Sequence, residues 1–247
     1  MPLNPQGTPG EGVYDIDDNL YESVCIAGIE WMAENLRTSR YKDGSVIPTG
    51  LLDDKWNNAW RNEMGAYAIY PHQEANGIDS DSEMVDAYGK LYNYFTIKDD
   101  RGVCPAGWDV PVIWSWTSDG WQTLKDYLLE EHDLSDDYDD PNGVGNALRS
   151  CLQVNHPDGG ECRTSAHLRW DETSNGLYSS DQFGFSALPS GTRAWWGNYS
   201  NLGTSASMWT WNTIHDVRVV YINDSRLWFS WDDGQIEGHA IRCIRRD

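Results

Sequence analysis

Aromatic and polar side chains gather between residues 211 and 239, in a stretch without helical spacing. Rings of this kind stack on the face of a sugar or anchor a protein interface, while Asn, Asp, His and Arg exchange hydrogen bonds with a ligand. We therefore predict a ligand-binding face in this stretch. Its residues are Trp211, Asn212, His215, Val217, Val219, Tyr221, Asn223, Asp224, Arg226, Trp228, Trp231, Asp232 and Asp233.

The acidic segment 133–142 could hold a cation. Asp136, Asp137, Asp139 and Asp140 are weak candidates for calcium ligands, because Ca²⁺ prefers carboxylate oxygens. Their spacing differs from that of the helix–loop–helix calcium site. No metal or cofactor other than this calcium is expected.

The five cysteines are an odd number. Cys151 and Cys162 flank a turn at 157–160 and could form a disulfide that closes a short loop. Zinc bound by Cys151, His156 and Cys162 is the alternative, but it lacks a fourth ligand and the usual spacing. Disulfides would indicate an oxidising destination for the protein.

Motifs of several enzyme classes are absent from the sequence. It has no Gly-x-Ser-x-Gly, no phosphate-binding glycine loop and no His-Glu-x-x-His. A pair of carboxylates can always be found among 39 Asp and Glu residues, so such pairs decide nothing. We expect a protein that is not an enzyme.

The formal net charge of -21 limits the partners. A surface this acidic repels phosphate backbones and anionic membranes, so neither nucleic acid nor a membrane is expected to bind. No stretch is long and apolar enough to span a bilayer. Segment 1–10 has no basic region and no apolar run, so it is not expected to be a secretory signal; we expect a trimmed N-terminus or another exit route, such as lysis.

Helical spacing of apolar residues predicts one helix over 88–95 and a second that begins near Trp121. Ser118 or Asp119 would be the N-cap of the second helix. Residues from Phe183 onward have no helical period and predict strands and turns.

The N-terminal part predicts strands. Segment 13–30 alternates loosely, with a hairpin over 25–31, and segment 53–86 is expected to be an elaborated loop. Residues 1–12, rich in Pro and Gly, predict an extended arm before a single domain at 13–247. Two helices with a loop-rich, mainly antiparallel sheet predict the α+β class.

Four phrases in a fixed order carry a family resemblance. They are Trp-Met-Ala-Glu-Asn-Leu at 31–36, Tyr-Gly-Lys-Leu-Tyr at 88–92 running into Cys-Pro-Ala-Gly-Trp at 104–108, Phe-Gly-Phe-Ser-Ala-Leu-Pro-Ser-Gly at 183–191, and Ile-Arg-Cys-Ile-Arg-Arg at 241–246. Together they resemble the Fibrobacter succinogenes major paralogous domain, a family of surface modules similar to the C-type-lectin-like fold. The resemblance runs from about Tyr14 to the C-terminus and implies that fold. Asp109 departs from the pattern, because relatives often carry His there.

The resemblance also implies particular roles. It implies a disulfide between Cys104 and Cys243 that closes the domain and leaves Cys25 as a buried thiol. It implies that Trp209 and the pair Trp195–Trp196 belong to the framework core, and that the ring of Trp108 fills the core as well.

The C-terminal face departs from the family in an informative way. Strand periodicity puts Val217, Val219 and Tyr221 on one side and Val220 on the other. By the resemblance, Val220 matches an inward Leu, and Val217 and Val219 replace outward-facing tyrosines. Segment 225–239 stands where relatives carry Asn, Ser and Tyr. Codons for Asn and Tyr begin with AA and TA, so changes at adenines alone would yield Val, Ile, Asp, Ser, Phe, Leu and similar residues. Diversity-generating retroelements rewrite receptor-binding faces in this way; ordinary drift is the alternative.

We therefore predict a binding module that presents this face to a surface receptor, protein or glycan. The carrier would be a bacterial surface or a phage-like particle, and the location extracellular. A calcium-dependent sugar site is not predicted, because the Glu-Pro-Asn or Gln-Pro-Asp loop and the Trp-Asn-Asp strand are missing. The alternative is a structural or adhesion module without a diversified site.

Overall fold

The computed structural model describes residues 7–75, 77–113, 120–150, 170, 179–212, 216–223, 225–230 and 237–245, with the backbone alone at 212 and 216–218. Within these ranges the fold is α+β with mainly antiparallel sheets, as predicted, but it contains five α-helices and one 3₁₀ helix, so the prediction of two helices is wrong. The helices are α1 (Asp53–Arg61), the 3₁₀ helix η1 (His72–Glu74), α2 (Asp81–Tyr88), α3 (Tyr94–Lys98), α4 (Trp121–Glu131) and α5 (Val144–Leu148).

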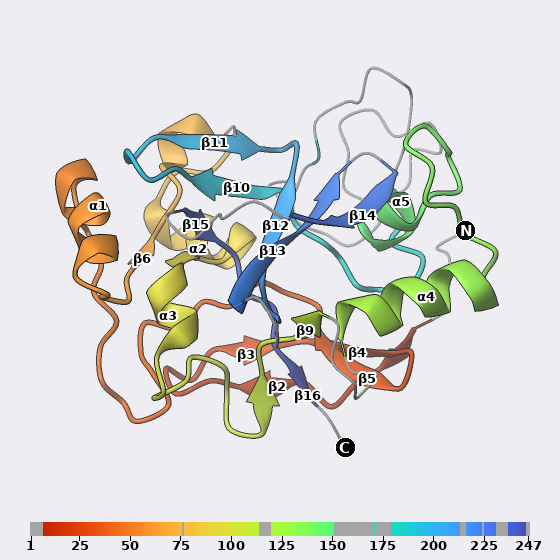
Figure 1. Cartoon of the computed structure of the whole chain (residues 1–247), viewed down its shortest axis with the longest axis horizontal. Helices are drawn as coiled ribbons and strands as arrows, with labels where there is room; N and C mark the ends of the chain where they lie inside the picture. Colours follow the sequence, from red (N-terminus) through yellow and green to blue (C-terminus); the bar gives the residue numbers. More distant parts are fainter. Residues whose placement is uncertain are drawn as a thin grey trace.

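The first sheet brings the N-terminal strands together with the last strand of the chain. Its order is β1-β4-β5-β16-β8, so the red β4 and β5 lie in one sheet with the dark blue β16 (Figure 1). The strands are β1 (Thr8–Pro9), β4 (Ser23–Ile26), β5 (Ile29–Met32), β8 (Trp108–Asp109) and β16 (Ile244–Arg245). A separate pair is formed by β2 (Val13–Tyr14) and β3 (Leu20–Tyr21).

Two further sheets are built largely from the second half of the chain. The second has the order β11-β10-β15-β7-β6, and the third has the order β14-β13-β12-β9. The strands of the second are β6 (Tyr67–Ala68), β7 (Leu91–Asn93), β10 (Ser190–Arg193), β11 (Tyr199–Leu202) and β15 (Gly238–His239). Those of the third are β9 (Val112–Ile113), β12 (Ala206–Asn212), β13 (Asp216–Asn223) and β14 (Arg226–Phe229).

The predicted hairpin over 25–31 is confirmed as β4 and β5. Ala27 and Gly28 form its turn with φ values of 56° and 74°, the left-handed pair that a two-residue hairpin turn requires. The predicted arm over 1–12 contributes Thr8–Pro9 to the edge of this sheet. A sheet edge tolerates Pro9, because proline has no backbone N–H to donate to a second neighbour.

The helix predicted over 88–95 is wrong. Helix α2 ends at Tyr88, and Gly89 follows with φ 77°, where a Cβ would approach the Cβ of Asn35 to 2.6 Å. Residues 91–93 then form β7 between β6 and β15, and α3 begins only at Tyr94. The helical spacing of the rings thus spans two helices and a strand, because pairing with the sheet outweighs the local pattern.

The segment 53–86 is also more regular than predicted. It is not an elaborated loop but contains α1, β6, η1 and most of α2. The helix predicted near Trp121 is confirmed as α4, with Trp121, Leu124 and Leu128 buried on one face. Its proposed N-caps, Ser118 and Asp119, lie outside the described residues, and Gly120 occupies the N-cap position.

The third sheet is packed on both faces. Val220 and Ile222 of β13 belong to one core cluster with Trp31 and Trp121, whereas Val219 belongs to another with Trp209. The prediction that Val219 faces outward is therefore wrong, since only 1% of it is exposed. The side chain of Val217 lies outside the described residues.

The predicted framework tryptophans divide into two groups. Trp108 and Trp209 are buried, as predicted. Trp195 and Trp196 are 40% and 54% exposed, so their assignment to the core is wrong. They occupy the turn between β10 and β11, which is closed by the hydrogen bond from the backbone N–H of Gly197 to the carbonyl oxygen of Ala194.

Arg242 joins three of the family phrases at the centre of the molecule. Its fully buried guanidinium donates to the Oδ1 atom of Asn35 at 3.0 Å, to the carbonyl oxygen of Met32 at 3.4 Å, and to the carbonyl oxygens of Phe185 and Ser186. It also lies 4.7 Å from the centroid of the Phe185 ring. Burial lowers the pKa of the guanidinium to about 9.

The remaining phrase, at 88–92 and 104–108, is attached through Asn35 and through Cys243, the residue after Arg242. The Nδ2 atom of Asn35 donates to the carbonyl oxygen of Tyr88 at 2.9 Å. Cys243 forms the predicted disulfide with Cys104, with Cα atoms 5.9 Å apart. The short phrases therefore meet around one buried arginine and one disulfide.

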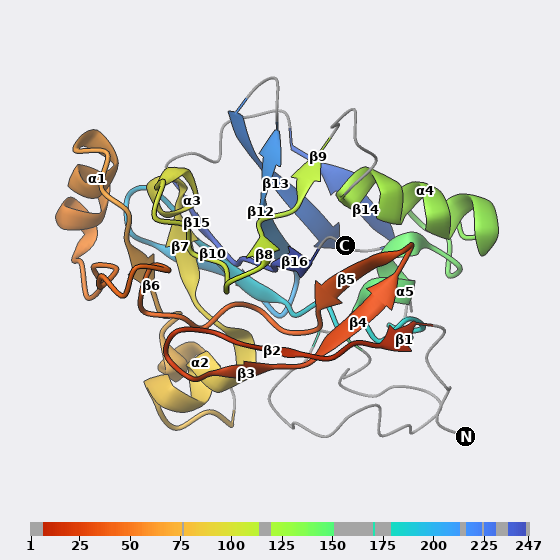
Figure 2. The same cartoon turned by 90° about the horizontal axis from the view of Figure 1, so that it is seen from below.

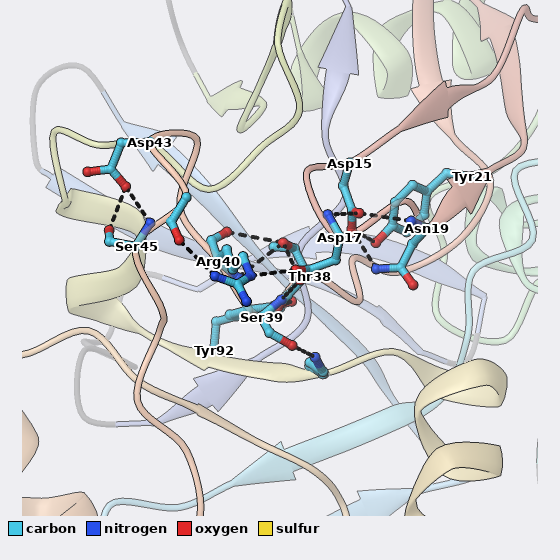
Figure 3. Close-up of polar contacts among 12 residues, drawn as sticks. Asp15, Asp17, Asn19, Tyr21, Thr38, Ser39, Arg40, Asp43, Ser45 and Tyr92 are labelled. Atoms are coloured by element: carbon cyan, nitrogen blue, oxygen red, sulfur yellow. Dashed lines mark hydrogen bonds and ion pairs between the residues drawn. The ribbon is translucent and has the colours of Figure 1, made fainter.

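A second polar network fixes the β2–β3 pair (Figure 3). The carboxylate of Asp15 accepts a hydrogen bond of 2.6 Å from the hydroxyl of Tyr21, and that of Asp17 accepts one of 2.5 Å from the backbone N–H of Ser39. Arg40 donates its Nε–H to Asp17 at 3.0 Å. Both carboxylates bond to the protein itself, so we assign this cluster to the framework.

We expect the two classes of tryptophan to differ in stability. Trp209→Ala should lower the free energy of unfolding by about 3–5 kcal/mol, because it empties a buried site and removes the Nε1 hydrogen bond of 2.6 Å to the carbonyl oxygen of Tyr92. Trp196→Ala should change it by about 0.5 kcal/mol or less. Urea unfolding of both variants measures this; equal losses would contradict the assignment.

Arg242→Lys should be strongly destabilising despite keeping the charge. A lysine ammonium cannot reproduce the planar fork that serves the carbonyls of Phe185 and Ser186, so the free energy of unfolding should fall by about 2 kcal/mol or more. Arg40→Lys, at a partly exposed ion pair, is the control and should cost less than about 1 kcal/mol. Similar urea midpoints for the two variants would disprove the central role of Arg242.

Candidate functional site

The register of the third sheet places three of the predicted ligand-binding residues, Trp211, Tyr221 and Trp228, on one face. Tyr221 lies between Ser207 of β12 and Trp228 of β14, and Trp211 pairs with Val217 further along. Alternation directs Val220, Ile222 and Leu227 into the core on the opposite face. We call the side that carries Trp211, Tyr221 and Trp228 the ligand face.

Helix α3 divides the ligand face into two ends. Figures 1 and 2 both place α3 beside β12 and β13, and Tyr94 of α3 makes an edge contact with Trp209, at a centroid distance of 6.4 Å. Trp209 and Val219 are consequently buried in the middle. One end with Tyr221 and Trp228, and another with Trp211, remain half-buried.

At the first end, two rings form a fixed stack. The rings of Tyr221 and Trp228 lie 4.6 Å apart between centroids, at an interplanar angle of 16°. The Nε1–H of Trp228 donates to the Oδ1 atom of Asn223 at 2.8 Å, which fixes the orientation of the indole. We call these three half-buried residues the aromatic end.

An acidic and an imidazole group lie beneath the aromatic end. The Oε2 atom of Glu237 is 3.3 Å from the Nε2 atom of His239, which is fully buried, and this contact lowers the pKa of the Glu237 carboxyl. Burial, and then the negative charge of Glu237, raises the pKa of the Tyr221 phenol to about 12. Tyr221 is therefore a neutral hydrogen-bond donor throughout the physiological pH range.

Ser207 completes a line of hydroxyl, imidazole and carboxylate, since its Oγ atom is 3.0 Å from the Nδ1 atom of His239. Such a line can activate a nucleophile when a substrate reaches the hydroxyl. Here Ser207 is fully buried, and its Oγ also contacts the carbonyl oxygen of Gly191 at 3.3 Å. A substrate cannot reach this hydroxyl, so we assign the line to positioning the Tyr221 ring from below.

The remaining predicted site residues fall into three groups. Arg226 is half-buried, with its guanidinium carbon 5.0 Å from the centroid of the Tyr138 ring. For two positions in the strands, the side chains lie outside the described residues: Asn212 and Val217. Five other positions lie wholly outside them: His215, Asp224, Trp231, Asp232 and Asp233.

The structure describes some of the cysteines and of the predicted calcium ligands. Cys151 and Cys162 lie outside the described residues, and Cys25 is half-buried in β4. Asp136 forms an ion pair with Lys125 at 2.7 Å, and the Oδ1 atom of Asp140 accepts a hydrogen bond from the backbone N–H of Asn142 at 2.8 Å. Within the described ranges, no three His, Cys, Asp or Glu side chains are grouped so that they could hold a metal ion.

Sequence reasoning missed Glu237 and His239. Their separation of two residues puts them on one side of an extended segment, which is a local signal. That they lie beneath Tyr221 depends on the pairing of β15 with β10 and β7, which no local pattern reveals.

Comparison with family models identifies one family for this chain. The model of the Fibrobacter succinogenes major domain matches residues 24–245. No curated protein matches the chain, and no solved structure matches it. Among the described helices, none has the length and apolar character needed to cross a membrane.

The carboxylate of Glu237 should affect the pH at which the Tyr221 phenol titrates. Glu237→Gln should move the titration of the Tyr221 ring from about pH 12 toward lower pH, because it removes a negative charge that opposes phenolate formation. Ring-carbon NMR, assigned with Tyr221→Phe, measures this. Glu130→Gln, on the exposed side of α4, is the control and should leave the titration unchanged.

The raised pKa of the Tyr221 phenol also makes the free energy of unfolding depend on pH. The folded chain holds the Tyr221 proton more tightly than the unfolded chain does. This residue's contribution to the free energy of unfolding should therefore fall as pH rises from 10 to about 12. An identical Tyr221 titration in wild type and Glu237→Gln would show that Glu237 does not act on this ring.

Proposed function

The chain belongs to the Fibrobacter succinogenes major domain family, and from that premise we propose that it is a non-catalytic binding module with a C-type-lectin-like fold. Its ligand is a surface receptor, protein or glycan, that docks on the aromatic end of the ligand face. The module works outside the cell, on a bacterial or virion surface. The Cys104–Cys243 disulfide supports an oxidising destination.

The stacked pair of Tyr221 and Trp228 carries the proposal. Both rings are half-buried, so each offers apolar surface to a partner while one of its faces is held by the other ring. Rings fixed in this way lose little conformational freedom on binding, which leaves more of the contact energy for affinity. Trp and Tyr are also the side chains that most often dominate interfaces.

We further propose that the exposed part of this face is diversified by a retroelement. Val219 is buried, so a substitution there would alter packing rather than recognition. The positions that can vary without disturbing the core are the half-buried ones: Tyr221, Asn223, Arg226 and Trp228. A reverse-transcriptase gene beside a near-copy of the 3′ end, differing only at adenines, would test this; its absence would favour an adhesion module of fixed sequence.

Receptor binding should depend on the rings of the aromatic end. Trp228→Ala should weaken receptor binding by about 2 kcal/mol or more, roughly 30-fold, because the ring is an anchor. Binding to intact cells and to a glycan array measures this. Trp60→Ala, which removes a ring 40% exposed on α1, is the matched control and should bind like wild type.

Two further measurements make the test sharp. Asn223→Ala frees the indole without removing it and should weaken binding by a smaller factor, which separates recognition from folding. A chelator should leave binding unchanged, because the calcium-dependent sugar motif is missing from the sequence. Binding that survives Trp228→Ala, or that requires calcium for one simple sugar, would refute the proposal.

A further inference from the structure

The other end of the ligand face opens into a cleft of about 350 Å³. It lies beyond α3 from the aromatic end, between α3, the segment 99–104 and the strands β8 and β9. The half-buried Trp211 forms one wall. We propose that this cleft binds one neutral sugar ring of a glycan, independently of the aromatic end.

The apolar part of the cleft fits one face of a sugar ring. Trp211 is joined there by Ile97, Val103, Val110 and Val112. A pyranose presents C–H groups on one face, and an indole can cover such a face while excluding water. The volume is near the lower end of ligand sites, at roughly 300–1,000 Å³, so it suits one ring rather than a long chain.

The polar rim carries both signs of charge. Lys42 and Lys98 supply N–H donors, and Asp99, Asp100 and Asp109 supply carboxylates, of which Asp99 is already paired with Arg101. The Nζ atom of Lys42 lies 3.7 Å from Asp109, which balances part of this charge within the rim. A strongly charged ligand of either sign would meet like charge here, whereas hydroxyl groups can donate to the carboxylates and accept from the ammonium groups.

The walls of the cleft are fixed before any ligand arrives. The backbone N–H of Trp211 donates to the carbonyl oxygen of Pro111 at 2.9 Å, and the Nζ atom of Lys42 donates to that of Trp108 at 3.1 Å. Cys104, which lines the cleft, is covalently tied to Cys243. A preformed site of this kind loses little entropy when it binds a small ligand, so even one sugar ring can be retained.

The test is a titration of the full chain, followed by backbone amide NMR, with glucose, galactose, N-acetylglucosamine and their β-1,4-linked disaccharides. We expect at least one probe to give saturable shifts at residues 97–103 and 109–112. Trp211→Ala and the exposed Asp109→Asn should each raise the Kd at least tenfold. Asp109→Asn keeps the shape of the side chain, so its effect reports on the rim rather than on folding.

Two controls separate this site from the proposed receptor site. Trp228→Ala should leave the sugar titration unchanged, and Trp211→Ala should leave binding at the aromatic end unchanged. The inference is overturned if no probe gives saturable shifts, if both cleft variants titrate like wild type, or if the shifts map to 221–228 instead. Shifts at 221–228 would instead indicate that the sugar binds at the aromatic end and that the cleft is not a sugar site.

Discussion

The burial of Arg242 is the constraint on which the rest of the structure depends. A guanidinium removed from water is costly unless its donors are satisfied, and here the acceptors come from segments far apart in the chain, at Met32, Asn35, Phe185 and Ser186. Those segments must therefore converge before the cation can be accommodated. The disulfide next to Arg242, between Cys243 and Cys104, fixes the same convergence covalently. This explains in physical terms why the short sequence phrases occur together.

The same arrangement determines what the ligand face can present. With the last strand held between β5 and β8, the preceding segment bonds to β12 through the backbone of Ala240 and brings His239 and Glu237 close to Tyr221. Helix α2 ends just before Gly89, so the chain forms β7 before α3 begins at Tyr94 and packs that ring against Trp209 on the face. The framework therefore presents two separate aromatic surfaces. That division is the basis for assigning the ends different ligands.

The distribution of charge has a related origin. The chain has 18 Lys and Arg against 39 Asp and Glu, and several of its arginines lie over aromatic rings. The guanidinium–ring pairs include Arg37–Tyr21, Arg101–Tyr41, Arg149–Trp170, Arg193–Trp56 and Arg242–Phe185. Arg149, Arg193 and Arg242 are almost completely buried, so the surface is more acidic than the composition suggests. Some of the aromatic rings therefore cover buried guanidinium groups, while others fill the core.

The sequence by itself determined the family, the α+β class, the Cys104–Cys243 disulfide, the β4–β5 hairpin and helix α4, because these rest on local patterns or on phrases in fixed order. It could not determine which rings are exposed. Trp195 and Trp209 are the same residue type in similar strand-and-turn surroundings, yet one lies on a hairpin turn and the other beneath α3. Strand alternation assigned Val219 to one side of β13 correctly but could not reveal that α3 covers that side. Exposure depends on what packs against a face, and that is decided only when distant segments converge in the tertiary structure.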